Sequence, residues 1–151
     1  MPTDLDAFFA DYADSYNQAL GAAPDYDRIR RFFSDCFVGA GPLGVHCGPN
    51  DDSFTKALRE GYAFYKAIRT RRMNFRRVET TPIDERHVMA RVFYRADYER
   101  ASGEPLSIDF DVVYMLETAG ERPRIFAFVA GDELGLYRRH GLVDAAGKPV
   151  G

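Results

Sequence analysis

Apolar residues over the first seventy positions recur every three or four residues, which is the period of a helix with one buried face. The longest run begins behind Thr3, which forms a capping-box pattern with Asp6, and ends before Gly21. Two further runs share this period, "PDYDRIRRFFSD" and the segment that follows "NDDS". The pattern therefore predicts three helices in the N-terminal half of the chain.

From about residue 73 the apolar period changes to two, which is typical of strands with one face toward a core. Four segments have this period, with turn-forming residues between them: 73–81, 87–99, 106–117 and 124–132. The glycine- and proline-rich "CFVGAGPLGVHCGPN" is expected to hold at most a short strand or a bulged loop. After the strands, "DELGLYRRHG" predicts a closing helical turn capped by Asp132.

Helices that precede an antiparallel sheet indicate an α+β domain with the helices on one face of the sheet. The 151 residues suit a single domain. We expect this domain to span residues 1–143 and to be followed by a flexible C-terminal tail at 144–151.

Composition and charge narrow the classes of partner. A net charge of −3 provides no overall field that would attract nucleic acid, and the arginine-rich "RTRRMNFRR" suits a helix end and a sheet edge. The acidic N-terminus lacks a signal-peptide pattern, and no apolar run reaches the roughly 20 residues of a membrane span. We therefore expect a cytoplasmic protein that binds neither nucleic acid nor membrane.

The two cysteines, Cys36 and Cys47, do not have the spacing of a metal site, so we expect no metal and no other cofactor. They could form a disulfide in an oxidising compartment. A cytoplasm would keep both thiols reduced, which is the favoured alternative.

The order of the expected elements, together with the segment "YNQALGAAPDYDRIRRFFSDCFV", resembles the nuclear transport factor 2-like (NTF2-like) superfamily. That superfamily includes SnoaL-like polyketide cyclases and ketosteroid isomerases, and the resemblance extends from about Leu5 to about Leu142. It implies three helices packed on the concave face of a strongly curved, mixed but mainly antiparallel sheet. This cone-shaped barrel would enclose a pocket for a small molecule.

The resemblance to ketosteroid isomerases also implies an oxyanion hole formed by Tyr16 and a protonated Asp111. Their general base does not carry over, because Ala40 and a neighbouring glycine stand where the loop carboxylate is expected. Asp109 could move the proton instead. His46 is a second candidate for that task, or else a loop histidine with a structural hydrogen bond.

The residues themselves allow plainer roles. Tyr16 could be a core aromatic residue, and Asp111 could face solvent on the outer face of the sheet. Asp109 is expected to form a cross-strand ion pair with Arg91 or Arg95. Both faces of "LSIDFDVVYMLE" are half apolar, so the alternation leaves open which face of this strand lines the pocket.

Aromatic side chains give the expected pocket its chemical character. The residues predicted to contact a ligand are Phe9, Tyr12, Tyr62, Tyr65 and Phe128. A cavity lined by tyrosine hydroxyls and one or two acids suits a flat, mostly apolar ligand with a carbonyl or phenol group.

These residues support three functional hypotheses. The first is a lyase, isomerase or cyclase that acts on a polyketide-, steroid- or terpenoid-like carbonyl compound. The second is a non-catalytic ligand-binding domain of the same fold, which the missing loop carboxylate favours. The third is a homodimer formed through the outer sheet face, where Phe110, Val112 and Tyr114 would supply an apolar surface if they point outward.

Overall fold

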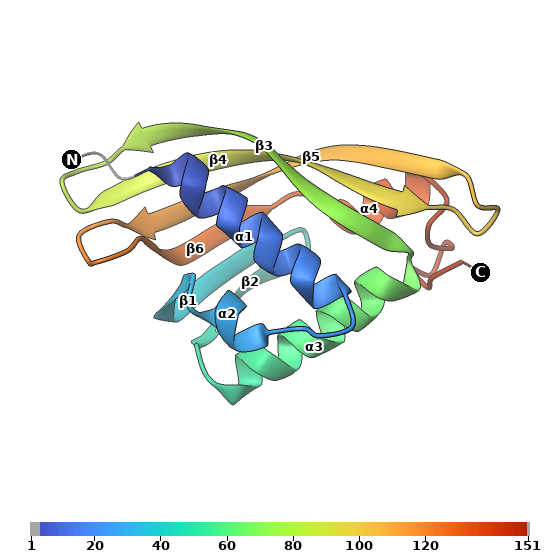
Figure 1. Ribbon diagram of the computed structural model, residues 1–151, viewed down its shortest axis with the longest axis horizontal. Coiled ribbons are helices and arrows are strands. Elements are labelled where there is room, and N and C mark those ends of the chain that lie inside the picture. Colours follow the sequence, from blue (N-terminus) through green and yellow to red (C-terminus); the bar gives the residue numbers. More distant parts are fainter. Residues whose placement is uncertain (1–3, 151) are drawn as a thin grey trace.

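The computed structural model describes residues 4–150 and shows an α+β fold built on a curved sheet that does not close (Figure 1). Within these residues the sheet has six strands in the order β2-β1-β6-β5-β4-β3. The strands are β1 (Phe33–Gly41), β2 (Gly44–Pro49), β3 (Thr70–Pro82), β4 (His87–Glu99), β5 (Pro105–Glu117) and β6 (Arg124–Ala130). Neighbouring strands run antiparallel except β1 and β6, which are parallel. The predicted fold class, with a mixed and mainly antiparallel sheet, is confirmed.

Four helices accompany the sheet in the described part of the chain: α1 (Leu5–Leu20), α2 (Tyr26–Arg30), α3 (Asp52–Ala67) and α4 (Glu133–Arg139). Figure 1 shows α1 along the sheet beside β3, with α2 and α3 below it. The backbone N–H of Ala7 donates to the Asp4 side chain (3.0 Å), which caps α1. The cap predicted at Thr3 lies outside the described residues.

A side-chain amide holds α1 on the edge of the sheet. Asn17 Nδ2 donates to the Met73 carbonyl (2.9 Å), and the Met73 backbone N–H donates to Asn17 Oδ1 (2.8 Å). These two bonds satisfy backbone groups of β3, an edge strand that would otherwise leave them free. They also fix the rotation of α1, and with it the direction of the neighbouring Tyr16.

The β1–β2 hairpin corrects two sequence predictions. The second helix ends at Arg30, and the glycine-rich segment forms two paired strands where at most a short strand or a bulged loop was expected. The local geometry requires glycine at two of its positions. A Cβ on Gly39 would lie 2.7 Å from the ring of Phe128, and Gly44 has φ +126° after the turn. Glycines that are typical of loops are therefore used here in a hairpin that packs tightly against Phe128.

The register of β5 is settled by burial. Ile108, Val112, Tyr114 and Leu116 are buried on the concave face, and the partly buried Phe110 packs with them. Asp109 and Asp111 therefore lie on the outer face, since successive side chains alternate. Phe110, Val112 and Tyr114 consequently point inward, so the condition under which they would supply an outer apolar surface is not met.

The main core lies between α1 and the concave face. Phe9, with 0% of its surface exposed, packs against the ring of Tyr114 with 4.9 Å between centroids. Burying a side chain of this size contributes about 1.5–3 kcal/mol relative to leaving it in water. The core therefore anchors α1 firmly over the sheet.

The C-terminal segment folds back on the domain. Val143 pairs with Pro149, and the Asp144 carboxylate accepts hydrogen bonds from the backbone N–H groups of Ala146 and Lys148 (2.9 Å each). The flexibility expected for residues 144–151 stays a prediction.

None of the helices described is long and apolar enough to cross a membrane. The described residues also contain no group of three or more His, Cys, Asp or Glu side chains that could hold a metal ion.

Candidate functional site

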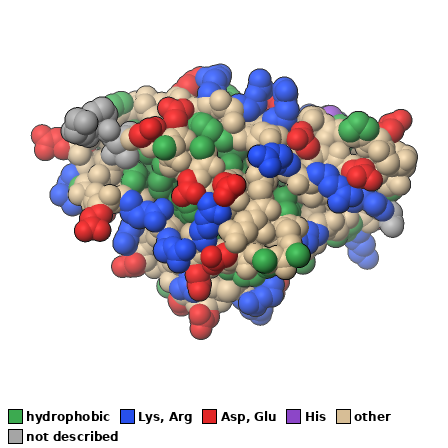
Figure 2. Space-filling model, in the orientation of Figure 1, with side chains coloured by type: hydrophobic (Ala, Val, Ile, Leu, Met, Phe, Trp, Pro, Cys, Tyr) green, Lys and Arg blue, Asp and Glu red, His purple; other side chains and the backbone are tan. Residues whose placement is uncertain are grey.

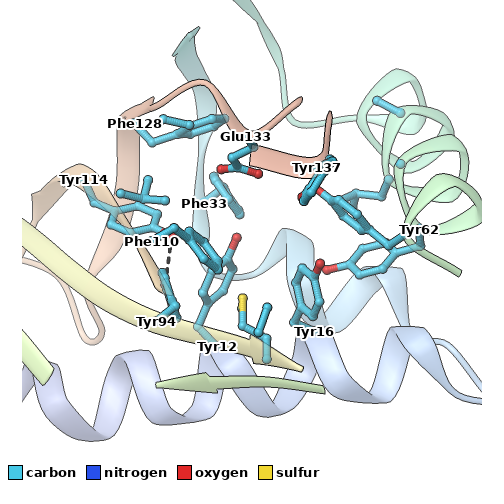
Figure 3. A pocket seen from close by; sticks show the side chains of 18 of the residues that line it. Tyr12, Tyr16, Phe33, Tyr62, Tyr94, Phe110, Tyr114, Phe128, Glu133 and Tyr137 are labelled. Carbon is cyan, nitrogen blue, oxygen red and sulfur yellow. Dashed lines mark hydrogen bonds between the residues drawn. The ribbon is translucent and has the colours of Figure 1, made fainter. Parts of the chain in front are cut away.

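A cavity of about 260 Å³ lies between the helices and the concave face of the sheet (Figure 3). Eight of the nine tyrosines of the chain line it, and they come from α1, α3, β4, β5 and α4. These are Tyr12, Tyr16, Tyr62, Tyr65, Tyr94, Tyr98, Tyr114 and Tyr137. Phenylalanine, alanine, leucine, valine and methionine side chains form most of the remaining wall. The cavity is thus apolar in its body, with hydroxyl groups around it.

Most of the residues predicted to contact a ligand have the expected position. Tyr12, Tyr62, Tyr65 and Phe128 all line the cavity. Phe9 does not, because it is buried in the core beneath Tyr114. The ligand-binding role of these side chains stays a prediction.

Tyr16 is placed in the cavity by its position on α1. Its ring contacts those of Tyr62 and Tyr65 from α3, with centroids 5.0 Å and 5.4 Å away. Figure 3 shows the hydroxyl groups of Tyr16 and Tyr62 pointing toward one another. This convergence creates a place where one ligand oxygen can meet two hydroxyl donors.

The expected partnership between Tyr16 and Asp111 is wrong. Asp111 lies on the outer face of the sheet, where Arg91 Nη1 donates to its Oδ2 (2.8 Å) and 39% of its side chain is exposed. It does not line the cavity. The alternation of β5 that buries Val112 is the physical reason, since adjacent side chains point to opposite faces.

Asp109 forms the ion pair expected of it. Arg95 donates to it through Nε (2.6 Å) and Nη2 (2.9 Å), and Arg76 Nη1 donates to its Oδ2 (3.2 Å). Hydrogen bonding from Arg95 lowers the pKa of the Asp109 carboxyl. The carboxyl group therefore stays ionised on the outer face and has no access to the cavity.

His46 and the two cysteines lie on the β1–β2 hairpin, away from the cavity wall. His46 is exposed and stands opposite Gly39 in the register, and it is not among the lining residues. Cys36 and Cys47 are exposed and free. The role suggested for His46 as a proton carrier in the pocket has no geometric support.

The acid that does line the cavity is Glu133, which the sequence analysis did not single out. It is the first residue of α4, a helix capped by Asp132 through the backbone N–H of Gly135 (3.0 Å). Figure 3 shows its carboxyl group directed into the cavity between Phe128 and Tyr137. The available signal was its position four residues before Tyr137, which places both side chains on one face of the helix.

Burial controls the protonation of this site. It raises the pKa of Glu133, and the hydroxyl of Tyr137 offsets part of that rise. Burial also raises the pKa of Tyr16 and Tyr62 well above the ordinary value, with smaller contributions from neighbouring tyrosines. The tyrosines are therefore neutral donors at physiological pH.

One hydrogen bond orders the sheet side of the cavity. The hydroxyls of Tyr94 and Tyr114 lie 2.8 Å apart.

Burial raises the pKa of Tyr98 to about 12. Among the described lining residues there is no Arg, Lys or His, so Glu133 is the one charged type of side chain in a wall of otherwise neutral residues.

Comparison with solved structures shows the same fold at low sequence identity. The chain is similar to the beta subunit of benzoate 1,2-dioxygenase from Burkholderia mallei, with a TM-score of 0.66 and 16% identity over 96% of this chain and 98% of that one. It is similar to the protein Aln2 from a Streptomyces species, with a TM-score of 0.64 and 16% identity over 92% and 99% of the two chains. A ketosteroid isomerase-like protein from Erwinia carotovora has a TM-score of 0.58 and 15% identity over 83% and 91%.

No curated protein matches the chain. A family model described as NTF2-like protein (DUF6841) matches residues 3–133. This match covers most of the chain and agrees with the curved sheet and its helices, so the protein belongs to this NTF2-like family.

Proposed function

We propose that the tyrosine-lined cavity binds a compact, mostly apolar molecule with a carbonyl or phenol oxygen and moves a proton on it. The reaction class is that of an isomerase, lyase or cyclase. The observation that carries the proposal is Glu133, a half-buried acid with a raised pKa in a cavity otherwise lined by neutral side chains.

The tyrosine hydroxyls supply the electrophilic half of this chemistry. A carbonyl oxygen between Tyr16 and Tyr62 would accept two hydrogen bonds, and these would strengthen as negative charge develops during enolisation. Their positions are fixed by ring contacts, which reduces the reorganisation needed when charge appears.

Glu133 supplies the proton-moving half. A carboxyl whose pKa is shifted upward, toward neutral pH, is better suited to accept and return a proton than one at its ordinary value. One such group is enough for an isomerisation, because it can remove a proton from one carbon and deliver it to another. Glu133 thus takes the role that the sequence analysis had sought for Asp109 or His46.

The size of the cavity favours a small substrate. Its volume of about 260 Å³ is just under the roughly 300–1,000 Å³ of typical pockets for drug-sized ligands. A compound of one or two rings suits this volume better than a four-ring steroid.

The test is proton exchange at carbon next to a carbonyl. A panel of small cyclic and aromatic ketones in deuterated buffer is followed by proton NMR with native protein, with Glu133→Gln and with Asp111→Asn. The native protein and Asp111→Asn should accelerate exchange equally, and Glu133→Gln should lose most of the acceleration. Exchange that stays at the buffer rate across the panel, or that survives in Glu133→Gln, would overturn the catalytic role.

A second candidate is a binding or assembly domain without catalysis. Two observations favour it: Ala40 and Gly41 stand where ketosteroid isomerases are expected to carry a loop base, and one structural neighbour is a dioxygenase beta subunit. Ligand binding without any proton exchange would select this candidate.

Dimerisation through the outer sheet face belongs with this second candidate. The outward apolar side chains include Met89 paired with Met115, and Val113 paired with Val129, where Met89 is 38% and Val129 54% exposed. Sedimentation equilibrium tests this face, since Val129→Glu should convert a dimer into a monomer. A native protein that is monomeric at working concentration would rule the dimer out.

A further inference from the structure

A second hollow of about 450 Å³ lies on the surface beside the cavity. We call it the arginine pocket; its lining residues are Asp27, Arg30, Arg31, Phe33, Asp35, Asn50, Arg122 and Arg124. They come from α2, the start of β1, the residue after β2, and the turn that leads into β6. Figure 2 shows Lys and Arg side chains over α2 and the adjoining end of the sheet, with Asp and Glu side chains among them.

The arginine pocket carries an excess of positive charge. Four guanidinium groups and two carboxylates line it, and the Asp52 carboxylate lies 3.8 Å from Arg30, which leaves a local net charge of +1 in a chain whose formal net charge is −3. Concentrated positive charge in a hollow raises the local concentration of anions. The tyrosine-lined cavity differs in this respect, because none of its described lining residues is basic.

The floor of the arginine pocket is rigid. Arg30 donates to Asn50 through Nε (2.9 Å) and Nη2 (3.1 Å), and to Thr55 Oγ1 through Nη1 (3.0 Å). Asn50 Nδ2 in turn donates to the carbonyl oxygens of Arg30 (2.8 Å), Ser34 (3.2 Å) and Phe33 (3.3 Å). Arg30 is therefore a fixed charge whose donors are largely used within the protein.

Other arginines keep donors for a ligand. In the described part of the chain, neither Arg31 nor Arg122 has an ion-pair partner. The Arg122 guanidinium lies over the ring of Phe32, 5.3 Å from its centroid, which holds the arginine in place without using its N–H groups. Arg124 has only a 3.7 Å contact with the fully exposed Asp35.

We propose that the arginine pocket binds a phosphoryl group of a small molecule. The planar guanidinium groups of Arg31 and Arg122 can each donate two parallel N–H bonds to phosphoryl oxygens, while Arg30 adds a fixed charge. A negatively charged phosphoryl group complements this excess of positive charge. This site is separate from the tyrosine-lined cavity, and Phe33 is the side chain that lines both.

The test is calorimetric titration of the full chain with pyrophosphate at low ionic strength, where exposed charges are least screened. Native protein should bind saturably, and the double variant Arg31→Ala/Arg122→Ala should weaken binding about tenfold or more. The control Arg77→Ala/Arg86→Ala removes the same charge from the exposed β3–β4 region and should change affinity less than about twofold. Equal weakening by both variants, or no binding by native protein, would overturn the site.

Two comparisons define the ligand. Titrations with phenyl phosphate and with inorganic phosphate distinguish a phosphate ester from a free phosphate ion. Binding of either compound supports the proposal. Tighter binding of phenyl phosphate would identify an ester as the source of the phosphoryl group. Malonate presents a similar charge without a phosphoryl group. Malonate binding as tight as that of pyrophosphate would contradict recognition of a phosphoryl group.

A competition experiment keeps this proposal independent of the proposed function. Pyrophosphate should leave binding of a neutral phenol in the tyrosine-lined cavity unchanged. Displacement of the phenol by pyrophosphate would place the anion in the cavity and overturn the separate site. A protein that binds pyrophosphate but no phenol would keep the arginine pocket and reject the proposed function.

Discussion

Carboxyl groups on the two sides of β5 have opposite surroundings. On the outer face, Asp109 and Asp111 are half exposed and held by arginines. On the concave face, the strand contributes Phe110, Val112 and Tyr114 to a cavity whose acid comes from α4. Two aspartates in a conspicuous central strand are thus surface ion pairs, and the acid suited to chemistry is a glutamate in a short helix. The burial and the charged neighbours of a carboxyl group decide its pKa and its possible chemical role, and its position in a sequence pattern does not.

The largest expected effect comes from placing a charge on the wrong face of β5. Leu116 is completely buried, so Leu116→Asp would leave an unpaired carboxyl in the core and should cost about 3–5 kcal/mol. Met115→Asp adds the same group on the outer face and should cost less than about 1 kcal/mol. Urea unfolding of both variants measures the difference. Equal losses would mean that the two faces do not differ as described.

A smaller effect is expected where β1 approaches β6 on the concave side. In Gly39→Ala the new Cβ would meet the Phe128 ring at 2.7 Å, and overpacking of this kind costs about 1–3 kcal/mol. Gly48→Ala on β2 is the matched control, because nothing lies within 4 Å of its Cβ position. Thermal unfolding should separate the two variants; a Gly39→Ala protein as stable as the control would show that Phe128 is free to move.

The sequence predicted much of this fold for identifiable reasons. The regular apolar spacing of α1 and the alternation in β3 to β6 have a single physical interpretation, so these elements were predicted correctly. The β1–β2 hairpin was missed because Gly39 is there for close contact with Phe128, a reason that local sequence does not reveal. The inward face of β5 remained undecided because Val113 and Met115 make its outer face half apolar, and only burial in the folded protein distinguishes the two faces.

The candidate site was predicted in part. The tyrosines of α1 and α3 were found because helical spacing places them on one face. Glu133 was not, because the chain must turn at Gly131 before α4 directs this side chain back over the sheet. Such a return is tertiary information, which residue spacing along α4 does not contain.

A still smaller effect concerns pH, where the inner and outer acids should behave oppositely. Burial raises the pKa of Glu133, so the folded protein holds this proton more tightly than the unfolded chain. The free energy of unfolding should therefore fall as pH rises from the ordinary glutamate range through the raised value. Arg95 lowers the pKa of Asp109, so that carboxylate stabilises the fold above its unfolded value, and its contribution is lost as pH falls through the lowered value.

Urea unfolding from about pH 3 to about pH 8 separates these two contributions. Glu133→Gln should remove the loss of stability on the alkaline side. Asp109→Asn should remove the contribution on the acid side. If Glu133→Gln left the alkaline limb of the native profile unchanged, Glu133 would not be the buried titrating acid of the cavity.

The most direct test of the central claim, that ligands bind among the tyrosines and not near the aspartates of β5, is a titration with substituted phenols. Ultraviolet absorbance follows the binding to native protein, Tyr16→Phe and Asp111→Asn. Native protein and Asp111→Asn should bind with the same affinity, and Tyr16→Phe should bind about two- to tenfold more weakly through loss of one hydrogen bond. Binding that Asp111→Asn weakens and Tyr16→Phe leaves intact would contradict the account.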